Sequence, residues 1–327
     1  MRHVFLNTFD KLQLGGETNS AQLAICERDG VWSIVWSDGV NEADNWFEGT
    51  SWEELMLAFR HGIAVKMGEG YKPVIDGMLD ERKNAEGGMQ QMLQCYGELH
   101  ANKELFETLR SWRRAAAAAE KKSSYLVATN RMLWMISAFV PQTPEELLQI
   151  PGWGENKHAA YGEQLLEITA SAEQTRGFPL HWVAEELEPS VFTGWLFKQK
   201  ESKYGQELQR LRQKKRILAF ASDGGSLEQL QSELELSRRE LMDRIEQLDK
   251  EGYDFEGMVA RELASMPQPE HEQILLAFAQ EGDRYLKPVL QQVYGSESVK
   301  EKQVEVLYEK LRLVRLQYRK SNSRAIS

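Results

Sequence analysis

The sequence is poor in cysteine and has neither a long apolar run nor an excess of positive charge. Its only cysteines, Cys26 and Cys95, show no spacing typical of a disulfide framework or a zinc site. No segment approaches the roughly 20 apolar residues of a membrane span, and the N-terminus has no apolar signal-peptide core. We therefore expect a cytoplasmic protein that makes no contact with a membrane.

Net charge limits the way in which the chain can bind a polyanion. The formal charge of −10 argues against a protein that attracts nucleic acid through its overall field. Any contact with nucleic acid must instead come from local basic patches.

Catalytic signatures are also missing from the sequence. There is no G-x-x-x-x-G-K-[ST] phosphate loop, and no nucleophile elbow links serine, histidine and aspartate. The histidines are not spaced from cysteines or carboxylates in the way that metal ligands are. These absences predict a protein that is not an enzyme and that holds no cofactor and no metal.

The residues that are present predict a mainly α protein with a small α+β domain at residues 1–75. Residues 21–26 and 31–36 have the apolar and β-branched character of strands, with an Asp-Gly hairpin signal between them. A capping box at residues 51–54 begins a helix with apolar residues at helical spacing. We expect a small sheet covered by one helix, followed by a polar linker at 76–100.

The rest of the chain is predicted to be helical. Capping boxes at Ser226 and Ser237 begin two short helices, and together these predict a helix-turn-helix. A short helix at 216–222 is expected before them, and a pair at 270–280 and 299–318 after them. The predicted parts are a helical bundle at 101–176, a connector and charged helix at 177–214, a helix-turn-helix domain at 215–320 and a flexible tail at 321–327.

A Gly-Trp-Gly turn is the strongest candidate for a binding site. Gly152 and Gly154 bracket Trp153, and a helix that carries Lys157 follows at once. Glycine allows positive φ and a close backbone approach, and the amides of a helix N-terminus suit a phosphate. Trp153 has two interpretations: it packs into a core, or it is partly exposed and stacks on a base or sugar.

Two further sets of cations are candidate nucleic-acid contacts. One set lies at the ends of the predicted bundle helices. The other set lies at the start of the second helix of the predicted helix-turn-helix, where such motifs contact DNA. For both sets the alternative is structural: a solvated helix face for the first, and packing or protein contact for the second. The first set is Arg113, Arg114, Lys121, Lys122 and Arg131, and the second is Arg238 and Arg239.

Residues 102–176 resemble the helicase-and-RNase-D C-terminal (HRDC) domain. The resemblance depends on Leu105-Phe106 with Leu109-Arg110 and Trp112-Arg113, on Tyr125 to Asn130, on Thr143 to Leu148, and on Ile150 to Gly154 with Lys157 and Tyr161-Gly162. It implies a small helical bundle of the kind appended to RecQ-type helicases and RNase D. Such a bundle serves as an auxiliary nucleic-acid-binding or protein-interaction module and has no catalytic activity of its own.

Residues 215–319 resemble the helix-turn-helix module at the C-terminus of some RecQ-like helicases. The likeness is in Asp283 to Leu290 and in Tyr308 to Arg315. No motor and no acidic exonuclease site accompanies either likeness in the sequence. We therefore predict a non-enzymatic accessory protein that binds DNA or RNA, with single-stranded or structured DNA favoured. The alternative is an adaptor that recruits a helicase or nuclease through protein contacts.

Overall fold

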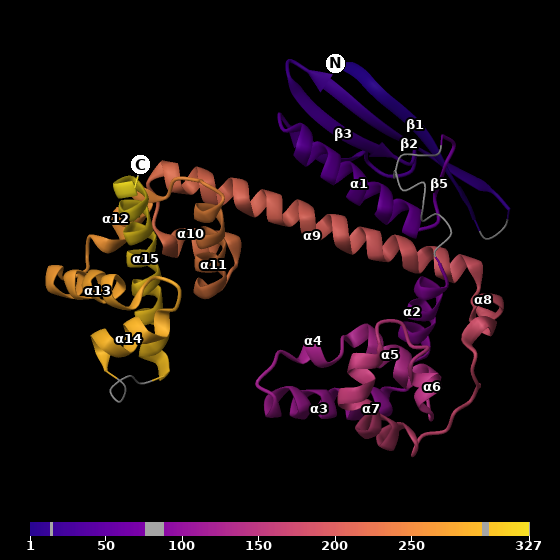
Figure 1. Cartoon of the computed structure of the whole chain (residues 1–327). Helices are drawn as coiled ribbons and strands as arrows, with labels where there is room; N and C mark the ends of the chain where they lie inside the picture. The colour runs from indigo at the N-terminus through magenta and orange to yellow at the C-terminus, as the bar shows by residue number, and fades with distance from the viewer. Residues whose placement is uncertain (14–15, 76–87, 296–300, 327) are drawn as a thin grey trace. The chain divides into compact units, whose positions relative to one another are not determined.

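The structure is a computed structural model that describes residues 1–13, 16–75, 88–295 and 301–326. The chain divides into two compact units, Met1–Gln206 and Glu207–Ser327 (Figure 1). The first unit contains a small sheet, its covering helix and a helical bundle, and the second is helical where it is described. The fold is therefore mainly α with a small α+β N-terminal domain, as the sequence predicted.

An antiparallel sheet in the order β4-β3-β2-β1-β5 begins the first unit. The Asp-Gly hairpin prediction is confirmed, because Asp29 and Gly30 both have positive φ and Arg28 pairs with Val31 across the turn. The strands are β1 (Arg2–Leu12), β2 (Thr18–Arg28), β3 (Val31–Ser37), β4 (Asp44–Gly49) and β5 (Lys72–Pro73).

Helix α1 (Trp52–Gly68) covers one face of this sheet (Figure 1). It begins at Ser51, whose hydroxyl accepts a hydrogen bond from the Glu54 N–H. Phe59 of α1 meets Phe5 of β1 edge to face. The apolar face of the helix therefore closes the core of the domain predicted at 1–75.

The helical bundle follows in the same unit. Its core contains Leu109, Leu133, Ile136 and Leu165, all fully buried. Thr143 caps α6 with Pro144 in the first turn, as predicted. The helices are α2 (Met89–His100), α3 (Lys103–Ala119), α4 (Ser124–Val127), α5 (Asn130–Phe139), α6 (Pro144–Leu147) and α7 (Glu155–Thr169).

The predicted linker at 76–100 is wrong over its second half. Helix α2 occupies Met89–His100 and contributes Leu93 to the bundle core. It packs closely on α5, since a Cβ on Gly97 would lie 2.9 Å from the Cα of Met135. The first part of the predicted linker, residues 76–87, lies outside the described residues.

Helix α9 corrects the boundary predicted at 214/215. It runs without a break from Pro189 to Asp223 and so includes the short helix expected at 216–222. A 3-10 turn, η1 (Leu180–Trp182), and helix α8 (Val183–Glu186) precede it within the predicted connector.

The second unit buries one apolar cluster that includes Leu241, Ile245 and Phe278. Helices α12 and α14 lie where no helix was predicted, and the expected flexible tail is instead helical as far as Ile326. Three residues separate α10 from α11, and the predicted caps Ser226 and Ser237 are confirmed. The helices are α10 (Leu227–Leu234), α11 (Arg238–Lys250), α12 (Glu256–Leu263), α13 (Gln268–Glu281), α14 (Leu286–Tyr294) and α15 (Glu301–Ile326).

Within the ranges given above, no helix has both the length and the apolar character needed to cross a membrane.

Candidate nucleic-acid interface

The Gly-Trp-Gly turn has the predicted backbone but not an exposed tryptophan. Gly152 has a φ of +88°, and the Trp153 N–H donates to the Ile150 carbonyl at 2.9 Å. The Trp153 side chain is only 2% exposed and belongs to the bundle core. The interpretation in which Trp153 stacks on a base is therefore wrong, because the ring has no accessible face.

Lys157 is held by backbone carbonyls. Its ammonium donates to the carbonyl oxygens of Leu126 at 2.6 Å and Val127 at 2.8 Å. These carbonyls lie at the C-terminal end of α4, where a cation is favoured. Burial lowers the pKa of Lys157. This residue therefore fastens the first turn of α7 to α4.

Gly154 is the N-cap of α7 and makes no side-chain cap hydrogen bond. Its carbonyl accepts from the N–H groups of Lys157 and His158, each at 3.0 Å. Glu155 occupies the first helical position and places a carboxylate near the helix start that was predicted to bind phosphate. The structure thus gives this helix end a structural role in the turn.

Arg113 is a buried structural residue. Its side chain points into the bundle, where Nη1 donates to the Ala128 carbonyl and to Asn130 Oδ1, both at 2.9 Å. Burial lowers its pKa, as do the nearby Arg110 and Arg114. The predicted phosphate contact by Arg113 is wrong, because the residue is only 8% exposed.

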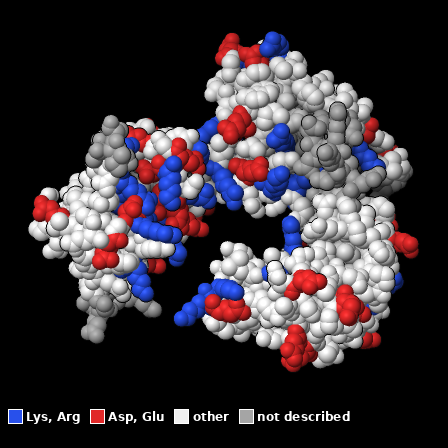
Figure 2. All heavy atoms as spheres, in the orientation of Figure 1, with Lys and Arg blue, Asp and Glu red and all other residues white. Residues whose placement is uncertain are grey.

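The remaining predicted cations of the bundle are exposed. Among the described residues, Arg114 and Lys121 have no hydrogen-bond or ion-pair partner. Lys122 lies 2.6 Å from Glu120, and this contact raises the pKa of Lys122 and lowers that of Glu120. Arg131 donates to Gln199 of α9 at 3.1 Å. Lys and Arg side chains gather at the turn between α3 and α4 (Figure 2).

Two exposed apolar side chains lie directly beside these lysines, and the sequence reasoning did not select them as site residues. Tyr125 is 66% exposed and Leu126 is 52% exposed, although both lie in helix α4. We call Lys121, Lys122, Tyr125 and Leu126 the α3–α4 surface. Lys157 lies directly beneath it, because it binds the Leu126 carbonyl. In the sequence, the Lys121-Lys122 pair followed three residues later by an aromatic residue was the signal that could have identified this surface.

The arginines predicted in the second unit have different environments. Arg238 lies 2.7 Å from Glu309 and 3.7 Å from Glu262, so any phosphate contact by this residue would have to displace these carboxylates. Arg239 is exposed, and no partner for it is found in the part of the chain that the structure describes. The two neighbouring arginines therefore do not form one cationic pair.

No cluster of three or more histidine, cysteine, aspartate or glutamate side chains suited to a metal ion is found among the described residues. The candidate site therefore consists of exposed cationic and aromatic groups.

Comparison with known proteins identifies part of the first unit. Residues 102–169 match the HRDC domain family, which bears out the predicted resemblance. The chain is also 41% identical over 75 residues to the ATP-dependent DNA helicase RecQ of Bacillus subtilis (strain 168). That match covers 23% of this chain and 13% of the relative, so the chain spans about an eighth of the helicase's length. No solved structure matches. The likeness of the C-terminal residues to a helicase module stays a prediction.

Proposed function

We propose that this chain is a non-enzymatic accessory protein that binds nucleic acid through the α3–α4 surface of its HRDC domain. The observation that carries the proposal is the 66% exposed Tyr125 ring beside two lysines. A family match over residues 102–169 and a relative named as a DNA helicase support a nucleic-acid-associated role. Any unwinding or cleavage would come from a separate helicase or nuclease, since the sequence shows neither a phosphate loop nor an acidic exonuclease site.

The chemistry of the surface favours an unpaired base. An exposed aromatic ring stacks on any base, and such stacking contributes roughly 1–3 kcal/mol per base. Lys121 can contact a phosphate directly, and Lys122 can do so when a phosphate displaces Glu120; such contacts fix position without reading sequence. Bases within a duplex are stacked on each other, so single-stranded or structured DNA is the expected ligand. Single-stranded RNA offers the same groups and is the other nucleic acid to test.

Local charge must carry this binding, because the whole chain is acidic. With a net charge of −10, long-range attraction to a polyanion is weak. A patch with two lysines should therefore bind weakly, and salt should reduce the affinity strongly.

A fluorescence-anisotropy titration of the full chain tests the proposal, with single-stranded and duplex oligonucleotides at low and moderate salt. Tyr125→Ala should weaken binding to the single strand, whereas Tyr125→Phe should preserve it because the stacking ring remains. Trp153→Phe serves as the control for the buried tryptophan and should leave the affinity of the folded protein unchanged. Absence of binding at low salt, or equal affinities of the Tyr125→Ala variant and the parent protein, would reject the proposal.

An adaptor role is the second candidate, and the acidic charge balance is the observation that favours it. An adaptor would keep its partners after nuclease treatment of an extract, whereas partners bridged by nucleic acid would be lost. A pull-down from the same extract with the Tyr125→Ala variant also distinguishes the adaptor role from nucleic-acid binding. Partners bridged by nucleic acid should then be lost without nuclease, because the stacking ring that holds the strand is gone.

A further inference from the structure

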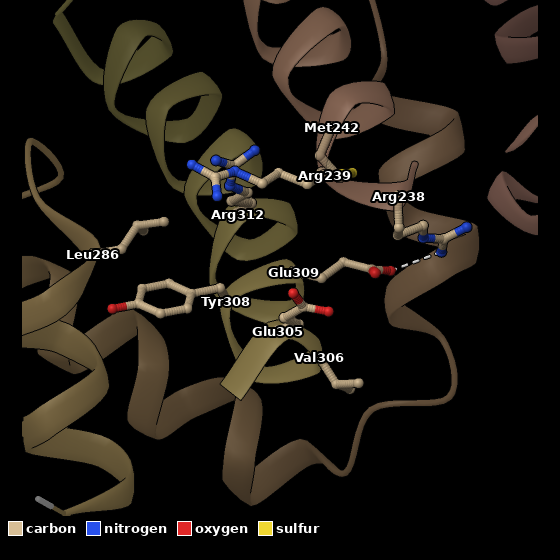
Figure 3. Close-up of a pocket in the computed structure, with 9 residues that line it drawn as sticks. All are labelled: Arg238, Arg239, Met242, Leu286, Glu305, Val306, Tyr308, Glu309 and Arg312. Atoms are coloured by element: carbon tan, nitrogen blue, oxygen red, sulfur yellow. Dashed lines mark hydrogen bonds and ion pairs between the residues drawn. The ribbon is translucent and has the colours of Figure 1, made fainter. Parts of the chain in front are cut away.

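The second unit contains a cavity of about 400 Å³ beside the start of α11 (Figure 3). Its volume falls within the range of pockets that hold small ligands. Residues from three helices line it: α11 contributes Arg238, Arg239 and Met242, α14 contributes Leu286, and α15 contributes Glu305, Val306, Tyr308, Glu309 and Arg312.

One of the three guanidinium groups in this cavity differs from the other two in its ion pairing. Arg238 is paired with Glu309 at 2.7 Å, and Arg312 with Asp243 at 2.5 Å. Arg239 is exposed and has no ion-pair partner among the residues that the structure describes. Within the described part of the chain, the cavity therefore presents one unpaired guanidinium to solvent.

A second guanidinium lies beside the first. Asp243 is one helical turn after Arg239 on α11, so the two residues share a face of that helix. Because Arg312 pairs with Asp243 from α15, its guanidinium lies against the same face of α11, and the ends of Arg239 and Arg312 overlap in the view of Figure 3. Asp243 already compensates the charge of Arg312, so a carboxylate that enters the cavity would form its charge-assisted hydrogen bonds with Arg239, next to the Arg312–Asp243 pair.

The rest of the lining is apolar. Met242 is 1% exposed and forms part of the wall, while Val306 is 56% exposed at its edge. Leu286 and Tyr308 add an aliphatic side chain and a ring. A ligand that only neutralised Arg239 would leave this apolar surface in water, so the cavity suits a carboxylate with an apolar group next to it.

We propose that this cavity binds a short peptide segment of a partner protein. A carboxylate of the segment binds Arg239, and the adjacent apolar side chain packs on Leu286, Val306 and Tyr308. The carboxylate comes either from an acidic side chain or from the C-terminus of the partner, since both present the same group.

Charge favours a peptide over a nucleic acid at this place. Glu305 and Glu309 belong to the same lining, and a backbone with a phosphate at every nucleotide would meet both carboxylates. A peptide has an isolated carboxylate and also backbone N–H groups, from which Glu305 can accept hydrogen bonds. This peptide site goes beyond the proposed function, because it lies in the second unit and shares no residue with the α3–α4 surface.

Three fluorescein-labelled probes test the proposal with the full chain. The first is Gly-Ser-Gly-Ser-Leu with a free C-terminal carboxylate, and the second is the same peptide with a C-terminal amide. The third is Gly-Ser-Asp-Leu-Gly with a C-terminal amide. Saturable binding of the first but not the second assigns the terminal carboxylate, and binding of the third assigns an acidic side chain.

Arg239→Ala should weaken whichever probe binds by roughly tenfold or more, because it removes the free guanidinium. Arg244→Ala is the matched control, since Arg244 lies on the same helix but outside the cavity lining, and it should leave binding unchanged. Tyr125→Ala should also leave probe binding unchanged, which keeps this site separate from the nucleic-acid surface.

Three results would overturn the proposal: no saturable binding of any probe, equal binding by Arg239→Ala and the parent protein, or equal loss with Arg244→Ala. A fourth result would assign the cavity to nucleic acid instead. In that result a single-stranded oligonucleotide displaces a bound probe, and the Arg239→Ala variant binds this oligonucleotide more weakly than the parent protein does.

Discussion

Lys157 binds the carbonyl oxygen of Leu126 at 2.6 Å and thereby connects the Gly-Trp-Gly turn to the helix that carries Tyr125. The two segments are 31 residues apart in sequence. The turn thus contributes to the α3–α4 surface by holding it in place, while its own tryptophan fills the core. Lys157 therefore has a positioning effect in the HRDC domain, which differs from the phosphate contact that we propose for Lys121 and Lys122.

These two effects predict different responses to salt. Lys121→Ala and Lys122→Ala should each reduce the slope of log affinity against log salt by about 1, because each removes a proposed phosphate contact. Lys157→Met keeps the apolar stem and removes the ammonium, so it should weaken binding through a looser α4 while the slope stays the same. Anisotropy titrations over a salt series measure the slope.

Hydrogen exchange of residues 124–127 provides the control for Lys157→Met, since faster exchange there is the expected sign of the lost carbonyl contacts. A slope that falls by about 1 in Lys157→Met would instead show that Lys157 itself contacts a phosphate.

Local signals in the sequence predicted much of the fold. The caps at Ser51, Thr143, Ser226 and Ser237 were recognisable because a cap depends on a few consecutive residues. Helix α2 was missed because its buried face includes Cys95 and Gly97, which give no apolar periodicity. The break predicted inside α9 followed a change in charge, yet no glycine or proline lies between residues 206 and 223 to end the helix.

The site was harder to predict, because burial depends on distant parts of the chain. Arg113 looks like a surface cation in sequence, but its partner is the carbonyl of Ala128, 15 residues away. Trp153 follows a turn, as an exposed ring could, but the bundle core encloses it. Tyr125 stands out in the sequence only as part of the family pattern, since its exposure appears only once α4 is in place.

The two glycines of the Gly-Trp-Gly turn should respond very differently to alanine. At Gly152 the φ of +88° disfavours an L-residue, and a Cβ would lie 2.6 Å from the Met132 Cε. Gly152→Ala should therefore lower the free energy of unfolding by about 1–3 kcal/mol. Gly154 has a negative φ and no atom within 4 Å of its Cβ position, so Gly154→Ala should cost below about 1 kcal/mol.

Urea unfolding, monitored by hydrogen exchange of the bundle helices, measures the free energy of unfolding of both glycine variants. Equal destabilisation by Gly152→Ala and Gly154→Ala would contradict the positive φ that the structure gives to Gly152.

Cys95 should make the stability of the bundle depend on pH in the alkaline range. Burial, with the Glu98 carboxylate nearby, raises the pKa of the Cys95 thiol from 9.0 to about 11. In the folded protein the thiol keeps its proton where the unfolded chain has lost it, so the free energy of unfolding should fall as the pH rises from about 9 to about 11. Cys95→Ala should show a shallower fall over the same range.

The measurement is urea unfolding at several pH values, with the pH slope rather than the absolute stability compared between the two proteins. Alkylation followed by mass spectrometry gives an independent check, because native Cys95 should react far more slowly with iodoacetamide at about pH 8 than the urea-unfolded chain. Rapid native alkylation of Cys95 would contradict its burial.

The second unit contains a buried ion pair between Arg315 of α15 and Glu246 of α11. The side chains are each 10% exposed, and Nη2 of the arginine lies 2.6 Å from Oε1 of the glutamate. Removing one partner leaves the other charge buried without compensation, so Arg315→Met and Glu246→Leu should each cost roughly 3–5 kcal/mol. The double variant should cost much less than the sum, because it leaves neither charge behind. Urea unfolding with hydrogen exchange of α11 and α15 measures all four proteins, and additive costs in the double variant would show that the two residues do not interact.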